Sequence, residues 1–166
     1  MEPLAGIRKI LKKGTEQPEA VRFHIPGKEK TWDQVTWGVM LARACEIALY
    51  LDRHGVAKDT KVSVFANTRL EWAFVAPAIE AVRGVFVPVY FSNTPDQTHY
   101  VVDHGDAEIL FTELALFPKV LARWPDYTKV REVILWDLED EAHLEAAVKQ
   151  ANADGQSTIA LEDVQS

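Results

Sequence analysis

The chain has 166 residues, enough for one domain with a core of its own, and its 48% apolar and 26% charged residues are typical of a soluble globular protein. No apolar run approaches the ~20 residues that a membrane span needs, and the first residues lack the features of a signal peptide, so we expect a cytoplasmic protein. The net charge of −7 comes entirely from residues 137–166, which hold eight acidic side chains and one basic one. The sequence has no basic footprint of the kind that binds nucleic acid, so we expect no nucleic-acid partner. The acidic residues 137–166 are interpreted as a solvated helix and linker rather than a partner-binding tail.

Residues 1–30 are expected to form an N-terminal segment with a short β-hairpin. An amphipathic helix through Ile7 opens it. The hairpin runs along AVRFHI, turns at Pro26-Gly27-Lys28 and returns over Lys30–Trp32.

A long helix is predicted from Trp32 to His54. Thr31 and Gln34 have the spacing of a capping box at its start, and Gly55 suits its end. Its expected buried stripe consists of Val35, Val39, Ala42, Cys45 and Leu49. The single cysteine, Cys45, is therefore interpreted as a small buried hydrophobe rather than a reactive thiol.

Residues 31–137 are predicted to form an α/β core. The expected strands are Lys61–Ala66, Val85–Tyr90, Glu108–Thr112 and Glu132–Asp137. The expected helices between them run over residues 68–83, 94–104 and 114–123. This alternation predicts a mostly parallel sheet flanked by helices, a Rossmann-like three-layer subdomain.

Caps and prolines refine this prediction. Thr68 and Glu71 suggest a capping box, and Pro77 should kink the helix that follows. Pro88 predicts a strand end, a bulge or an unpaired side, because proline cannot donate to a ladder. Residues 94–97, Thr-Pro-Asp-Gln, are typical of a helix N-terminus.

Residues 138–166 are predicted to form an acidic, exposed helix over 139–152 and then a linker. The chain closes on TIALEDV, a strand or helix start, and we expect this stretch to lead towards a further domain.

Ligands of open α/β sheets usually bind beyond the carboxyl ends of the strands. Asn67 and Arg69 follow the first core strand and could bind an anion; Tyr90, Phe91 and Ser92 close the second and could line an apolar or stacking pocket. The alternative interpretation is that Asn67 caps a helix while Arg69 is solvated. These five residues are the candidate ligand-binding residues.

Several kinds of site find no support in the sequence. The eight glycines are never spaced as GxGxxG or GxxxxGK[ST], so no phosphate-binding loop is predicted. His99 and His104 are five residues apart and do not share a helix face, so we expect no metal site. No catalytic residue is predicted.

The order and spacing of several motifs resemble the N-terminal region of the AMP-forming acyl-CoA synthetases, and most of all the long-chain fatty acid–CoA ligase type. The resemblance begins at KTWDQVTWGVMLARACEIALYLDRHGV and continues through DTKVSVFANTRLEWAFVAPAIEAVRGVFVPVY. It extends over FSNTPDQTHYVVDHGDAEILFTE and LFPKVLARWPDYTKVREVILWD.

The resemblance implies a ligase that uses ATP and Mg²⁺ to form an acyl-adenylate and coenzyme A to form the thioester. The phosphate loop, the adenine-site motifs and the catalytic lysine of that family have no counterpart in this sequence. We therefore expect the chain alone to be inactive and to bind no cofactor by itself. Its expected partner is the rest of the ligase chain, and the complete enzyme would bind a fatty acid and could associate peripherally with a membrane. Self-association through an exposed face of this subdomain is a further expectation.

Two rival interpretations remain. The chain could be a free-standing, non-catalytic interaction or regulatory domain of the same fold, or a flavodoxin-like binding protein. The absence of a phosphate loop argues against the second rival.

Overall fold

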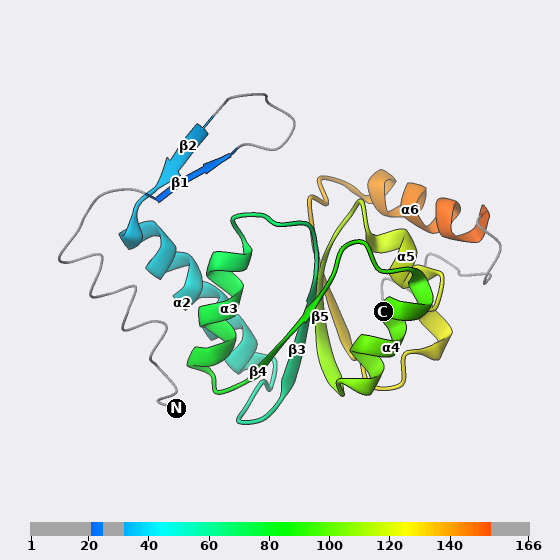
Figure 1. Cartoon of the computed structure of the whole chain (residues 1–166), viewed down its shortest axis with the longest axis horizontal. Helices are drawn as coiled ribbons and strands as arrows, with labels where there is room; N and C mark the ends of the chain where they lie inside the picture. The colour runs from blue at the N-terminus through cyan, green and yellow to red at the C-terminus, as the bar shows by residue number, and fades with distance from the viewer. Residues whose placement is uncertain (1–20, 25–31, 154–166) are drawn as a thin grey trace. The chain divides into compact units, whose positions relative to one another are not determined.

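The computed structural model describes residues 21–24 and 32–153, and the chain separates into two compact units (Figure 1). One unit holds the chain before Lys61 together with Thr68–Val85; the other holds Lys61–Asn67 and the chain from Phe86. Each is described by itself. Within the described ranges, no helix combines the length and apolar character that a membrane crossing requires.

The first unit contains a hairpin and two helices. Its elements are β1 (Val21–His24), β2 (Trp32–Val35), α2 (Trp37–Arg53) and α3 (Trp72–Ala81). The strands β1 and β2 are antiparallel, with Val21 opposite Val35, so the predicted hairpin is confirmed. Its return strand was placed too early along the chain, and the predicted turn at residues 26–28 lies outside the described residues.

The long helix begins five residues later than predicted. Thr36, in extended conformation, is the N-cap, and its hydroxyl accepts from the backbone N–H of Val39. The expected cap at Thr31 and Gln34 is wrong, because Gln34 lies in a strand. The end is within one residue of the prediction: the helix ends at Arg53 with His54 as its C-cap, and Gly55 adopts a φ of 77°, which glycine adopts without steric cost.

The predicted buried face of α2 is wrong. The buried residues are Met40, Ala44 and Leu51, whereas Cys45 is exposed, Val39 is 45% exposed and Leu49 is 57% exposed. Apolar residues occur on both sides of this helix, so their spacing did not distinguish the buried side from the solvent side. Figure 1 shows α2 beside α3, against which it packs.

The start of α3 also differs from the prediction. Its N-cap is Glu71, whose side chain makes no capping hydrogen bond and instead pairs with Arg69 at 2.7 Å. The capping box of Thr68 and Glu71 is therefore wrong. Pro77 lies inside the helix, as predicted.

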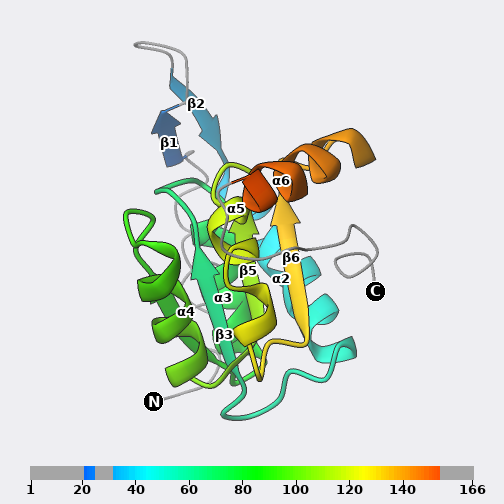
Figure 2. The same cartoon turned by 90° about the vertical axis from the view of Figure 1, so that its right-hand side faces the viewer.

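The second unit is built on a four-stranded parallel sheet in the order β4-β3-β5-β6. Its strands are β3 (Lys61–Phe65), β4 (Val85–Val89), β5 (Ala107–Glu113) and β6 (Glu132–Trp136). Figure 2 shows β3, β5 and β6 running in one direction. The predicted α/β fold with a parallel sheet is confirmed. Pro88 lies in β4, an edge strand, where a missing N–H is tolerated.

Helices connect and follow these strands. They are α4 (Pro95–His104), α5 (Phe117–Leu121), the 3₁₀ turn η1 (Trp124–Asp126) and α6 (Glu141–Ala153). The capping box of Thr94 and Gln97 that opens α4 is present as predicted. The helix predicted over residues 114–123 is shorter, because a turn at 114–116 precedes α5 and a 3₁₀ turn containing Pro125 follows it.

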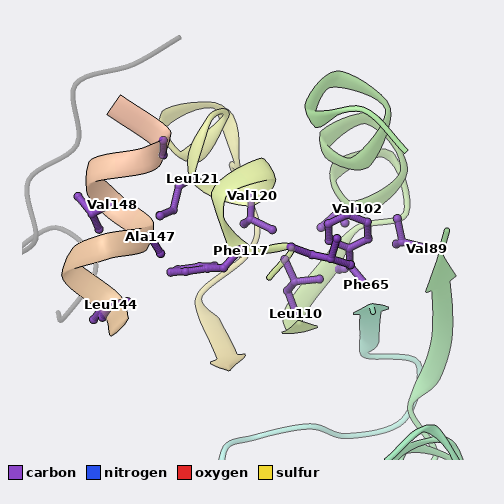
Figure 3. Packing of buried hydrophobic residues seen from close by; sticks show 13 residues of the cluster. Phe65, Val89, Val102, Leu110, Phe117, Val120, Leu121, Leu144, Ala147 and Val148 are labelled. Carbon is purple, nitrogen blue, oxygen red and sulfur yellow. The ribbon is translucent and has the colours of Figure 1, made fainter. Parts of the chain in front are cut away.

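The core of this unit lies between the sheet and the helices α4, α5 and α6 (Figure 3). Phe65 and Leu110 from the sheet, Val102 from α4 and Phe117 from α5 are all buried there. Helix α6 buries Leu144, Ala147, Val148 and Ala151. The prediction that the acidic helix is exposed is therefore wrong for the face that carries these four residues. Their helical spacing forms an apolar stripe that packs on the core, although the rest of the helix is acidic.

Candidate functional site

The carboxyl ends of the parallel strands gather at one edge of the sheet in the second unit. At this edge β3 leads into Asn67, β4 into Tyr90 and β5 ends at Glu113. Because all strands run the same way, residues that are distant in sequence meet here. This carboxyl edge is where open α/β sheets usually bind ligands.

Asn67 and Glu113 form a polar pair at the carboxyl edge. The side-chain amide of Asn67 donates to a carboxylate oxygen of Glu113, which is only 5% exposed. One strand position earlier, the buried Thr112 hydroxyl donates to the backbone carbonyl of Phe65 at 2.8 Å. Sequence reasoning selected Asn67 but not Glu113. An acidic residue at the end of an otherwise apolar strand was the signal that could have identified it.

The loop from Tyr90 to Asn93 forms the next part of the edge. The ammonium of Lys119, on α5, donates to the carbonyl oxygens of Phe91 and Asn93, both at 3.0 Å. Inside the loop, the N–H of Asn93 donates to the carbonyl of Tyr90 at 3.0 Å. Lys119 was not among the predicted residues, because nothing local in FPKVL indicates a contact so far away in sequence.

Two of the predicted aromatic side chains in this loop face solvent. Tyr90 is 79% exposed and Phe91 is 47% exposed, and Ser92 is exposed beside them. Tyr90 borders an open hollow of about 450 Å³. The hollow is lined by Tyr90, Asn93, Asp96, Gln97, Tyr100 and Val101. The two tyrosine rings and the amide side chains that line it can contact an apolar or planar group and donate hydrogen bonds to it.

Arg69 belongs to the first unit. Its guanidinium donates to Glu71 through Nε at 2.7 Å and through Nη2 at 3.1 Å, and its side chain is 16% exposed. This geometry is a bidentate ion pair. The structure therefore shows Arg69 engaged with a carboxylate, and its binding of an anionic ligand stays a prediction.

A second, polar hollow of about 300 Å³ lies at the C-terminal end of α4. It is lined by His99, Tyr100, Asp103, His104, Asp106 and Lys129. The pKa of Asp103 is lowered because the backbone N–H and the hydroxyl of Thr128 donate to its carboxylate. Lys129 pairs with Asp106, which lowers the pKa of the carboxyl and raises that of the amine.

These contacts tie α4 and the turn after it to the loop before β6. His99 adds a ring nitrogen 3.0 Å from the carbonyl oxygen of Asp126. Across the ranges that the structure describes, no three His, Cys, Asp or Glu side chains are grouped to hold a metal ion. The arrangement is best explained as a polar connection between neighbouring segments.

Comparison with known proteins extends this picture. Residues 11–165 match the family described as AMP-binding enzyme. A long-chain-fatty-acid–CoA ligase of Mycobacterium bovis, FadD15, is 35% identical over 82 residues, which are 49% of this chain and 14% of that protein. A 3-oxocholest-4-en-26-oate–CoA ligase of Rhodococcus rhodochrous is 25% identical over 118 residues, 71% of this chain and 20% of that protein. The matches thus span a fifth or less of these two relatives.

Solved structures show the same fold. A long-chain-fatty-acid–CoA ligase, FadD1 of Archaeoglobus fulgidus, superposes with a TM-score of 0.73 at 14% identity, over 95% of this chain and 31% of that chain. The N-terminal domain of FACL13 from Mycobacterium tuberculosis superposes with a TM-score of 0.68 at 14% identity, over 93% of this chain and 37% of that one. With a family match that covers most of its length, the chain belongs to the AMP-binding enzyme family.

Proposed function

We propose that this chain is the N-terminal α/β portion of an ATP-dependent, AMP-forming fatty acid–CoA ligase. The observation that carries the proposal is the family match over residues 11–165. The curated relatives include ligases for long-chain fatty acids and for a steroid carboxylate, and both kinds of substrate are apolar carboxylic acids joined to coenzyme A.

The carboxyl edge is the proposed substrate side of this portion. Asn67 with Glu113 supplies polar groups there, and Tyr90 with Phe91 supplies exposed aromatic surface. Such a combination suits a ligand with one apolar part and one polar part. In this proposal the chemistry of adenylation takes place on other residues, and these groups bind and orient.

ATP, Mg²⁺ and coenzyme A are the cofactors that the proposed reaction requires. Among the described residues, no three His, Cys, Asp or Glu side chains are grouped to hold a metal ion. The sequence likewise holds no glycine-rich phosphate loop. We therefore assign no step involving ATP or Mg²⁺ to this chain, and we propose that it has no ligase activity alone.

A chimera tests the proposal. The segment of FadD15 that corresponds to this chain would be replaced by this chain, and fatty-acid-dependent release of AMP and formation of acyl-CoA would be measured. We expect the chimera to form the thioester, while the 166-residue chain alone forms none. A chimera that also carries Lys149→Met serves as a control for unspecific effects of a surface substitution, because Lys149 is exposed on α6, and it should be as active as the parent chimera.

Two outcomes would count against the proposal. A soluble chimera that unfolds cooperatively yet releases no AMP would favour the rival view, a non-catalytic interaction domain of the same fold. Thioester formation by the isolated chain would refute its proposed inactivity.

A further inference from the structure

The side chain of Lys119 connects α5 to the loop that carries Tyr90 and Phe91. Its ammonium donates to two carbonyl oxygens of that loop, those of Phe91 and Asn93, each at 3.0 Å. The same nitrogen lies 5.9 Å from the centre of the Phe65 ring, at the end of β3. One side chain of α5 therefore reaches both the loop and the end of a strand within a single unit.

This loop needs such a connection. It follows β4, an edge strand that pairs on one side only, and it leads into the capped start of α4 at Thr94. Its internal bond, from the N–H of Asn93 to the carbonyl of Tyr90, closes a turn but does not fix that turn to the rest of the unit. The bonds from Lys119 do so, and charged donors make stronger hydrogen bonds than neutral ones.

The direction of the bonds determines which groups face outward. Carbonyl oxygens bound by an ammonium point towards α5. The rings of Tyr90 and Phe91 remain 79% and 47% exposed. We expect that loss of the cation would leave these carbonyls to water and the loop less restrained.

We propose that Lys119 is a positioning residue, which holds the Tyr90–Asn93 loop so that its aromatic rings are presented to the substrate side. This inference rests on the proposed function. In this proposal Lys119 acts on the binding of substrate and not on the chemical step, because two of its three N–H donors are used by the loop carbonyls.

The first test measures the loop directly in the 166-residue chain. Amide hydrogen exchange of residues 90–94 would be compared in the wild type, Lys119→Met and Lys119→Arg. Methionine keeps most of the apolar stem without the charge, and we expect exchange at Asn93 to rise about tenfold, while β5 is unchanged. Arginine keeps a charged donor and should restore most of the protection. Lys149→Met is the matched control and should leave the loop at the wild-type rate.

The second test separates positioning from simple stability. In the active chimera, Lys119→Met should raise the KM for fatty acid or coenzyme A several-fold while kcat changes less than twofold, and Lys119→Arg should reverse the change. Unchanged exchange in the loop would overturn the proposal. Faster exchange in Lys119→Met with an unaltered KM would also overturn it. The same holds if Lys119→Met lowers the thermal stability and Lys119→Arg restores it while the KM stays constant throughout.

The two proposals fail in different ways. A chimera with Lys119 intact that folds but has no activity rejects the proposed ligase function. Hydrogen exchange in the isolated chain then still decides whether Lys119 fixes the loop.

Discussion

Thr112 and Phe65 are opposite each other in the register of β5 and β3, and the buried hydroxyl of Thr112 donates to the carbonyl oxygen of Phe65 at 2.8 Å. Thr112→Val keeps the shape of the side chain and removes the donor. We expect the free energy of unfolding to fall by ~1 kcal/mol, the typical net value of such a bond. Urea unfolding checks this, with Thr112→Ser as the variant that keeps the hydroxyl. Equal stability of Thr112→Val and the wild type would contradict it.

The cap of α4 offers a second measurement. The Thr94 hydroxyl accepts from the N–H of Gln97, and the Gln97 side chain accepts in return from the N–H of Thr94. Thr94→Ala should cost ~1 kcal/mol of stability, because it removes the hydroxyl that accepts from the backbone N–H of Gln97. Thr94→Ser should cost much less. The idea fails if alanine and serine behave alike in thermal or urea unfolding.

Acid should weaken the connection between α4 and the loop before β6. The pKa of Asp103 is lower in the folded protein than its ordinary value of 3.8, because Thr128 donates two hydrogen bonds to the carboxylate. A depressed pKa adds stability above the unfolded-state pKa, and this stability disappears as the pH falls through the lowered folded-state pKa. Since the pair is exposed, the contribution should stay below ~1 kcal/mol.

Asp103→Asn is the variant that reveals this contribution. At pH 7 it should be less stable than the wild type, and the difference should shrink as the pH is taken below 3.8, the ordinary carboxyl pKa. Glu145→Gln, an exposed change on α6, is the control. A difference that does not depend on pH would show that the charge on Asp103 is not its source.

Cys45 gives a direct test of which face of α2 is exposed. The structure places its thiol at the surface, so a thiol reagent such as DTNB should modify it completely in the native protein without denaturant. Cys45→Ser should change the free energy of unfolding by no more than ~0.5 kcal/mol, as is usual for surface positions. Modification that requires unfolding would show that the opposite face of the helix is solvent-exposed.

Local signals predicted most of the regular structure. The strands β3, β4, β5 and β6 were found within two residues of their observed ends. The capping box at Thr94 and the stop at Gly55 were also found, because each depends on backbone groups only a few residues away. One error arose where two local signals competed: Thr31 and Gln34 have the spacing of a capping box, but the N-cap of α2 is Thr36.

The candidate site was predicted in part. Asn67, Tyr90, Phe91 and Ser92 lie at the carboxyl edge of the sheet, as the order of strands and helices indicated. Arg69 belongs to the other unit and pairs with Glu71. The role of each of the five as a ligand contact stays a prediction.

The sequence by itself determined the alternation of strands and helices, the start of α4 and the family resemblance, since these depend on short-range sterics and on the spacing of residue types. The tertiary structure decided which face of α2 is buried and brought Glu113 to Asn67 and Lys119 to the loop of Phe91. Those partners are separated by 46 and 28 residues. Such contacts come from the packing of parallel strands and helices into one unit, and no local pattern in the chain specifies them.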